Sequence, residues 1–463
     1  MKRMWKRVLA IALAVIYVFA LVGCAPEQSN DAPAASEPST GSATNEVTPN
    51  EAEATEEVVT IDFWFEGSGP ERTEAFQSII DEFNATHDNI QVEGTYLALD
   101  TALDKLTVAI SGGETPDVCT LQGSWLADMF SQEGLLVDLT DRFAAWEESS
   151  QFTTDFLDVV KYYAPDGKLY AIPQAANVFG LWYRPDLWAE KGLTDPAESW
   201  DALFSGITSM TDKENNVYGH TVRGGATSCT QLMYVLIAYT GCDSFFDENG
   251  QAQVLRSPAA VEIVNRYIDV YKNGEAPQSS LTASFKEMAA DFTSGTSVSY
   301  IHNLGSYETL KSAFDSSQYA FIMLPKSPVT GMYTTATPTV KANAMFTSCE
   351  HPDEAWEFMK FWASKEADGT INSVVGELPV RQDTLEEEWA KNAPQLKSVI
   401  PFLADPNKTT VMTPDFVPGY SDIAAQIGEP NFQAVMTGDM TAEEYLESIA
   451  VPLEEAYANY LAN

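Results

Sequence analysis

Residues 166–188 read DGKLYAIPQAANVFGLWYRPDLW, and this stretch decides the fold. It begins with a turn signal, Asp166-Gly167, because glycine adopts backbone conformations that other residues avoid. Two apolar runs follow, 169–172 and 178–183, and both are predicted strands. Between them stand Pro173, which cannot donate a ladder hydrogen bond and so ends the first strand, and four small or polar residues. Two strands joined in line by such a segment predict a chain that crosses from one domain to another.

Upstream of this stretch, strands alternate with helices. Residues 58–65, VVTIDFWF, form an apolar run that is typical of a strand buried on both faces. Further strands are predicted at 90–96 and 116–121, and amphipathic helices lie between them at 76–83 and 103–110. This alternation predicts an α/β fold in which helices flank a mostly parallel sheet.

The N-terminus has the features of a secretion signal. Four basic residues stand within the first seven positions, and an uncharged apolar run, 8–22, follows. That run is too short for a comfortable transmembrane helix and indicates a signal peptide over residues 1–23. The run ends in LVGC, which matches the bacterial lipobox and implies that a lipid is attached to Cys24 after cleavage. An ordinary signal peptide with a chance cysteine is the alternative.

Residues 24–57 are rich in alanine, glutamate, serine, threonine and proline, with almost no large apolar side chains. Such a segment cannot bury enough apolar surface to offset the entropy lost on ordering. We therefore expect a disordered tether that holds the folded part on the outer face of the cell membrane, as in a Gram-positive bacterium. The chain from residue 58 onward is long enough for two domains.

The formal net charge of −41 excludes some partners. A strongly acidic surface repels nucleic acid and anionic lipid headgroups. We therefore expect no nucleic-acid partner. Apart from Cys24, the cysteines are Cys119, Cys229, Cys242 and Cys349, and their spacing predicts no metal site. A Cys229–Cys242 disulfide would suit an oxidising compartment, but free buried thiols are the favoured interpretation.

Motifs of enzyme chemistry are missing from the sequence. We find no GxSxG, HExxH or Walker pattern and no context for a catalytic cysteine. Acidic pairs suited to a glycosidase are plentiful, but they carry little information in so acidic a chain. The sequence therefore predicts neither an enzyme nor a bound cofactor.

Several longer patterns share one known order and spacing. They are TIDFWFEG at 60–67, SGGETPDVCTLQGSW at 111–125, the stretch at 167–188, GGATSCTQLMYVLIAYTG at 224–241, FTSGTSVSYIHNLGSYETLKS at 292–312, CEHPDEAWEFMKFWASKE at 349–366 and GELPVRQD at 376–383. Together they resemble the extracellular solute-binding proteins of ABC importers, in the carbohydrate-binding branch. The resemblance covers nearly everything from residue 58 to the C-terminus.

This resemblance implies two α/β lobes, each with a mostly parallel sheet flanked by helices, and a ligand cleft between them. Three crossing segments would connect the lobes, near 173–176, 335–341 and 376–381. The N-terminal lobe would combine residues 58–174 with 341–377, and the C-terminal lobe residues 175–340 with 378–463.

The resemblance also implies a function. A lipid-anchored monomer would capture a sugar or oligosaccharide by closing its lobes and would deliver it to the transmembrane subunits of an ABC permease. The same fold binding a polyamine, a peptide or a phosphorylated polyol is the alternative. A glycosidase and a surface adhesin are less favoured alternatives.

A sugar-binding cleft needs flat apolar surfaces for the C–H faces of the sugar and polar groups for its hydroxyls. The candidate aromatic residues, all on predicted loops, are Trp125, Tyr307 and Tyr420. The candidate polar residues are Glu66, Gln122, Asn177, Arg223, His302 and Asn303, with Thr227 where many members of the family have an aromatic residue. Glu66 has a second interpretation, since an anionic side chain also stabilises the start of the following helix.

Overall fold

A computed structural model describes residues 58–67, 69–130, 134–164, 166–193 and 195–462. The predicted signal peptide, the tether and the lipidation residue Cys24 lie outside the described residues.

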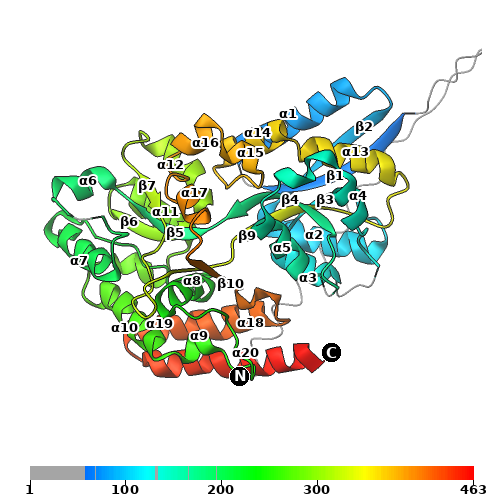
Figure 1. Cartoon of the computed structure of the whole chain (residues 1–463). Helices are drawn as coiled ribbons and strands as arrows, with labels where there is room; N and C mark the ends of the chain where they lie inside the picture. The colour runs from blue at the N-terminus through cyan, green and yellow to red at the C-terminus, as the bar shows by residue number, and fades with distance from the viewer. Residues whose placement is uncertain (1–57, 68, 131–133, 165, 194, 463) are drawn as a thin grey trace, which may run out of the picture. The chain divides into compact units, whose positions relative to one another are not determined.

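The first lobe is built on a five-stranded sheet in the order β2-β1-β3-β9-β4 (Figure 1). Its strands are β1 (Val59–Gly67), β2 (Ile90–Ala98), β3 (Val118–Gln122), β4 (Ala171–Asn177) and β9 (Thr339–Met345). Strand β1 is parallel to β2 and β3, whereas β9 runs antiparallel to both of its neighbours, β3 and β4. The strands predicted near 58–65, 90–96 and 116–121 are confirmed.

Helices cover this sheet because each has one apolar face. They are α1 (Pro70–Thr86), α2 (Leu99–Gly112), α3 (Gly123–Phe130), α4 (Thr140–Ala145), α5 (Thr154–Tyr162), α13 (Pro352–Trp362) and α14 (Lys365–Val375). The α1 residues Phe76 and Phe83 are buried at helical spacing. Trp362 of α13 contacts Phe76 and the β1 residue Phe63, with ring centroids 5.4 and 4.7 Å away. Edge-on aromatic contacts of this kind anchor the helices to the sheet.

The second lobe contains a three-stranded sheet in the order β6-β5-β7. Its strands are β5 (Phe179–Tyr183), β6 (Ser299–Asn303) and β7 (Ala320–Ile322). Here the structure differs from the expected parallel sheet, because β5 runs antiparallel to both neighbours. Strands β6 and β7 share one direction, as strands joined through a helix do, but β5 enters from the first lobe and inserts between them in the opposite direction.

The remaining elements surround this second sheet and the crossings. The longer helices are α7 (Trp200–Met210), α8 (Ser228–Thr240), α10 (Pro258–Lys272), α11 (Phe285–Thr293), α19 (Glu429–Thr437) and α20 (Ala442–Ala462). Short helices are α6 (Pro185–Glu190), α9 (Gln253–Arg256), α12 (Tyr307–Ala313), α15 (Gln382–Leu385), α16 (Glu388–Asn392), α17 (Val399–Leu403) and α18 (Tyr420–Ile423). Helix α8 is buried along nearly its whole length, as its apolar sequence requires.

Three segments connect the two sheets. One residue, Val178, separates β4 from β5. Strand β8 (Tyr333–Ala336), paired in parallel with β10 (Lys408–Val411), leads into β9. In the third segment, Leu378 exchanges two backbone hydrogen bonds of 2.9 Å with Ala176. The second and third segments lie within the predicted crossings, and the first lies two residues after the predicted 173–176, because β4 continues to Asn177. The lobe boundaries stay a prediction.

Two local expectations are wrong. Pro173 does not end its strand, because a bulge between Pro173 and Ala175 accommodates the missing donor and β4 continues to Asn177. Tyr307 does not lie on a loop: His302 and Asn303 end β6, a 3-10 turn (Leu304–Ser306) follows, and Tyr307 begins α12.

The cysteines of the described residues are free. Cys229 is buried, and it forms no disulfide with Cys242. No helix in the described ranges has both the length and the apolar character needed to cross a membrane.

A buried carboxyl group lies beside the third crossing. Asp368 on α14 accepts hydrogen bonds from the Asn372 side chain (2.8 Å) and from the backbone N–H of Val380 (3.4 Å). Burial raises the pKa of Asp368 to about 7. Between its usual pKa near 4 and pH 7, the folded protein therefore holds a proton that the unfolded chain has lost.

We predict that Asp368→Asn changes how stability depends on pH. The native protein should lose a few kcal/mol of unfolding free energy through Asp368 as the pH rises from 4 through 7, because the carboxyl must then ionise in a buried site. The amide cannot ionise, so the unfolding free energy of the variant should rise relative to that of the native protein over this pH range. Urea unfolding at pH 5 and pH 8 measures the difference, with the exposed Asp353→Asn as control. Parallel pH curves for native protein and D368N would contradict the assignment.

Candidate functional site

A cavity of about 410 Å³ lies between the two sheets. Residues of both lobes and of all three crossings contribute to it. Its lining consists of Glu66, Arg72, Gln122, Gly123, Tyr163, Asn177, Phe179, Tyr234, Phe285, His302, Asn303, Gly305, Glu308, Thr339, Val340, Lys341, Glu377 and Asp415.

The sheet topology determines which side chains reach the cavity. Glu66 and Gln122 stand at the carboxyl ends of the parallel strands β1 and β3, where ligands of α/β sheets usually bind. Asn177 ends β4, which runs in the same direction. Because β9 runs the opposite way, Lys341 reaches the same edge from near the start of its strand.

Glu377 is the centre of a buried ionic cluster. Its carboxylate accepts a hydrogen bond from Lys341 (3.0 Å) and one from Arg72 on α1 (3.3 Å). The side chains of Glu377 and Arg72 are nearly inaccessible to solvent. Burial opposes ionisation of Glu377, but the charges of Lys341 and Arg72 outweigh it and lower the pKa of the carboxyl to about 2. Glu377 is therefore ionised throughout the physiological pH range.

The same two cations also contact the remaining glutamates of the cavity. Lys341 lies 3.3 Å from Glu66, which also accepts a hydrogen bond of 3.4 Å from Gln122. Arg72 lies 3.7 Å from Glu308 of α12. A continuous chain of charges thus runs from the end of β1 through the third crossing to α12, and its two cations are shared among three carboxylates.

The second lobe contributes an aromatic wall. Phe179 of β5 stacks on Tyr234 of α8, with ring centroids 3.8 Å apart and an interplanar angle of 19°. Phe285 of α11 stacks on His302 at 4.2 Å and 14°. Tyr234 and His302 are buried and Phe179 and Phe285 are half-buried, and all four line the cavity. Each buried ring packs against one face of a phenylalanine.

His302 is a neutral member of this wall. Burial, with the nearby charge of Arg223, lowers its pKa to about 3. Its Nδ1 lies 2.8 Å from the hydroxyl of Ser306. A neutral imidazole packs against Phe285 without the desolvation cost of a buried cation.

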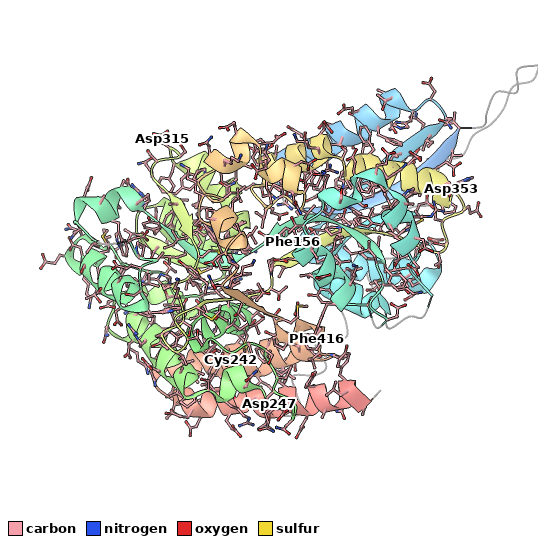
Figure 2. All side chains as sticks on the ribbon, viewed as in Figure 1. Phe156, Cys242, Asp247, Asp315, Asp353 and Phe416 are labelled. Carbon is pink, nitrogen blue, oxygen red and sulfur yellow. The ribbon has the colours of Figure 1, made fainter. Side chains whose placement is uncertain are left out.

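Asp415 provides an isolated carboxylate at another side of the cavity. It lies in a 3-10 turn (Pro414–Phe416) that the labelled Phe416 marks in Figure 2. Asp415 accepts hydrogen bonds from the hydroxyl groups of Tyr163 (3.1 Å) and Thr413 (2.7 Å). Within the described part of the chain, no lysine or arginine forms an ion pair with it, and burial raises the pKa of its carboxyl.

Half of the residues that the sequence nominates line this cavity. They are Glu66, Gln122, Asn177, His302 and Asn303. Glu66 is 1% exposed, and its carboxylate contacts Lys341 and the side-chain amide of Gln122. For all five, binding to a ligand stays a prediction.

The nominated aromatic residues are not among the lining residues. Trp125 lies in α3 and packs against the core. Tyr307 begins α12, where its ring contacts the backbone of Gly376. Tyr420 begins α18 and does not lie on a loop; it is 4% exposed, and its hydroxyl contacts Thr230. In the tertiary structure these rings pack against other residues and do not line the cavity.

Arg223 and Thr227 are also not among the lining residues. The guanidinium of Arg223 donates to the backbone carbonyl of Ala226 at 2.7 Å and to the side chain of Gln231 at 3.4 Å. Thr227 is exposed in a left-handed conformation (φ 62°) just before α8, and its N–H donates to Glu429. Both residues shape the start of α8.

Several lining residues were missed by the sequence interpretation. Phe179 lies within a predicted core strand, and Phe285 lies at the start of a helix, so neither differs from ordinary packing residues. Lys341 and Glu377 carried a usable signal, because each is a charged residue inside or at the edge of a predicted crossing segment. A charged residue in a predicted crossing segment is a candidate for lining the cleft.

The described residues contain no grouping of histidine, cysteine and carboxylate side chains that could hold a metal ion. The polar groups of the cavity are arranged as hydrogen-bonding partners and ion pairs.

Residues 68–369 match the family described as bacterial extracellular solute-binding protein. The mannitol-binding protein of Pseudomonas aeruginosa is 25% identical over 391 residues, which cover 79% of this chain and 86% of that protein. The sugar-binding protein MalE of Xanthomonas citri superimposes with a TM-score of 0.72 at 18% identity, covering 87% of this chain and 98% of that one. An ABC transporter solute-binding protein of Thermotoga lettingae, bound with α-D-tagatose, superimposes with a TM-score of 0.70 at 22% sequence identity. The superposition covers 86% of this chain and 99% of that one. These alignments confirm the predicted two-lobed fold.

We predict that Glu377→Gln lowers the unfolding free energy by about 3 kcal/mol at pH 7, because Arg72 and Lys341 then lose a buried counter-charge. The carboxyl has a lowered pKa, so its contribution is present above pH 4.5 and is lost as the pH falls towards 2. The difference between native protein and variant should therefore shrink between pH 7 and pH 3.

Denaturant unfolding at the two pH values measures this effect. Glu357→Gln is the control, because Glu357 forms a surface pair of 2.8 Å with Lys360, a kind of contact worth at most about 1 kcal/mol. Equal effects of E377Q and E357Q would show that the buried cluster contributes no more to stability than a surface ion pair does.

Proposed function

The chain belongs to the bacterial extracellular solute-binding proteins, the ligand-capturing components of ABC transporters, and we propose on this premise that it binds a carbohydrate in the cavity between its lobes. It then delivers the carbohydrate to the permease subunits of its importer. The observation that carries the proposal is that one wall of the cavity is aromatic and the other is polar and charged.

This combination suits the chemistry of a sugar. The supported rings of Phe179 and Phe285 offer flat apolar surfaces for the C–H faces of a pyranose or the backbone of a polyol. On the opposite side, Glu66, Asn177 and Gln122 offer acceptors and donors for hydroxyl groups. The mannitol, sugar and tagatose named for the similar proteins support the same ligand class.

The proposed cycle consists of binding, closure and release, with no covalent step. A ligand that contacts both walls favours the closed arrangement over the open one, because only the closed arrangement lets it reach both. The three crossing segments absorb the change in backbone angles. Affinities near micromolar, about −8 kcal/mol, would allow release to a permease.

Membrane attachment completes the proposal. The lipobox supports a lipid on Cys24, and the composition of residues 24–57 supports a tether that gives the folded part reach to the permease. A monomer attached in this way would work on the outer face of the cell membrane.

One observation favours a second ligand class. Four carboxylates line the cavity against two cations, and Asp415 has no cationic partner in the described part of the chain. An amine-bearing ligand, such as an amino sugar or a polyamine, would supply that partner. A phosphorylated polyol is disfavoured, because Arg72 and Lys341 are already paired with Glu377, Glu308 and Glu66.

We predict that neutral sugars or polyols raise the melting temperature of the purified protein in a concentration-dependent way. Ligand at 100 times its Kd should add about 2.7 kcal/mol to the unfolding free energy. A thermal-shift panel would contain mannitol, tagatose, maltose and maltotriose, with glucosamine and spermidine for the second class and glucose 6-phosphate for the disfavoured one. Stabilisation by spermidine alone would reject the carbohydrate proposal.

We further predict that Phe179→Leu weakens binding of the stabilising sugar about tenfold, which corresponds to ~1.4 kcal/mol for one lost stacking surface. Leucine keeps an apolar side chain over Tyr234, so the variant tests the flat ring and not the fold. Trp125→Leu is the matched control and should leave the affinity unchanged, because Trp125 does not line the cavity. Isothermal titration calorimetry gives both values, and the reverse ranking would place the sugar elsewhere.

A further inference from the structure

One of the four carboxylates that line the cavity differs from the others in its partners. The other three each form an ion pair with Arg72, with Lys341 or with both. They are Glu66, Glu308 and Glu377. An ammonium group of a ligand placed among them would also lie close to these two cations and would be repelled by them. Asp415 is the carboxylate that forms no ion pair with a lysine or arginine of the described residues.

Neutral groups hold the Asp415 side chain. One carboxylate oxygen accepts a hydrogen bond of 3.1 Å from the hydroxyl of Tyr163, and the other accepts one of 2.7 Å from the hydroxyl of Thr413. A carboxylate can accept about four hydrogen bonds, so these two donors leave capacity for a ligand. Burial raises the pKa of the carboxyl, because no positive charge offsets the loss of water. A cationic group of a ligand would supply that charge.

Packing fixes the turn that carries Asp415. The next residue, Phe416, is buried, and its ring contacts three tyrosine rings, with centroid distances of 5.2 Å to Tyr162, 5.8 Å to Tyr460 and 6.1 Å to Tyr457. Figure 2 labels Phe416 in this turn. Edge-on contacts between aromatic rings are favourable and hold the turn in place. The fold therefore presents the carboxylate to the cavity without the help of a counter-ion.

Aromatic side chains lie beside this carboxylate. Tyr163 follows α5, and Gly123 at the start of α3 leaves space for its ring, because a Cβ on Gly123 would lie 2.8 Å from that ring. Burial and the charge of Asp415 both raise the pKa of the Tyr234 phenol, so Tyr234 also lies near the carboxylate. Phe179 stacks on Tyr234, and all of these residues line the cavity.

A carboxylate beside aromatic rings matches the chemistry of an ammonium group. The carboxylate supplies the counter-charge, and the face of an aromatic ring attracts a cation within about 6 Å of its centre. A hydroxyl group gains less at this place, because it leaves the charge of Asp415 unbalanced. The part of the cavity that Asp415, Tyr163, Tyr234 and Phe179 form therefore favours an amine over a hydroxyl.

The rest of the cavity limits the ligand to one such group. A second ammonium group would find no unpaired carboxylate among the lining residues. The side chains of Gln122, Asn177 and Asn303 offer neutral donors and acceptors, which suit hydroxyl groups. A polyamine thus has one partner for several charges, whereas a sugar with a single amine has a partner for each kind of group.

We propose that the carbohydrate bound in this cavity carries one ammonium group, as a hexosamine does, and that Asp415 selects it. The inference rests on the proposed function and narrows the ligand from sugars in general to amino sugars. It also decides between the two amine-bearing classes, because it favours the amino sugar over the polyamine. Neutral sugars bind the same cavity with lower affinity.

The first test uses the ammonium group without a sugar. Methylammonium chloride at about 100 mM should raise the Tm of the native protein by on the order of 1 °C relative to sodium chloride at the same concentration. Asp415→Asn should abolish this difference, because the amide keeps the shape of the side chain and removes its charge. The hydroxyl groups of Tyr163 and Thr413 donate or accept as required, so the variant should fold.

The second test compares sugars that differ in one group. Calorimetry at pH 6, where the amine is protonated, measures the Kd values of glucose and glucosamine, galactose and galactosamine, and mannose and mannosamine. In the pair that binds most tightly, the amino sugar should bind the native protein about tenfold more tightly than the neutral sugar. In D415N this preference should fall to about twofold or less. Spermidine should bind the native protein more weakly than the amino sugar.

Asp291→Asn is the matched control. Asp291 on α11 also accepts hydrogen bonds from two hydroxyl groups, those of Thr221 and Ser279, both at 3.4 Å, and burial raises the pKa of its carboxyl. It forms no ion pair with a lysine or arginine of the described residues, and it does not line the cavity. D291N should therefore keep both the methylammonium effect and the preference for the amine. Circular dichroism verifies that each variant is folded.

Equal stabilisation of native protein and D415N by methylammonium, or stabilisation of neither, overturns the inference. So does a neutral sugar that binds at least as tightly as its amino counterpart, and in that case the carbohydrate proposal stands. If no sugar of the panel binds while the methylammonium effect depends on Asp415, the carbohydrate proposal fails and the assignment of Asp415 to a cationic group stands. The two failures therefore give different results.

Discussion

The structure depends on the burial of one carboxylate, Glu377, between two cations. Arg72 comes from the start of α1, Lys341 from near the start of β9, and Glu377 itself from the third crossing. A buried carboxylate is costly unless it is paired, and so is a buried cation, so the meeting of the three segments stabilises each of them. The pairing therefore holds the third crossing at the polar wall of the cavity.

The two walls of the cavity differ because the two sheets end in different ways. In the first lobe, the carboxyl ends of parallel strands and the start of β9 gather polar side chains at one edge. In the second lobe, β5 inserts between β6 and β7 against their direction and presents Phe179 next to a buried helix, α8. A ligand with both C–H faces and hydroxyls can satisfy the two walls at once, which is why the fold and the proposed carbohydrate function agree.

Helix α12 contributes both to the cavity and to contacts with the first lobe. Glu308 lines the cavity and lies 3.7 Å from Arg72. Lys311 does not line it, and its ammonium group contacts Glu71 and the backbone carbonyl of Val374.

The sequence by itself determined most of the local elements and the α/β alternation, because hydrophobic periodicity and turn residues are local properties. The two lobes and the three crossings were implied by its resemblance to a known family. It also placed Glu66, Gln122 and Asn177 at strand ends, where a ligand would bind. Only the tertiary structure decided which aromatic rings reach the cavity. The sequence places Phe179 in a core strand and Tyr420 on a loop, yet Phe179 lines the cavity and Tyr420 is buried, since exposure depends on neighbours far along the chain. The direction of β5 and the meeting of Arg72, Lys341 and Glu377 likewise arise from long-range packing, which no local pattern encodes.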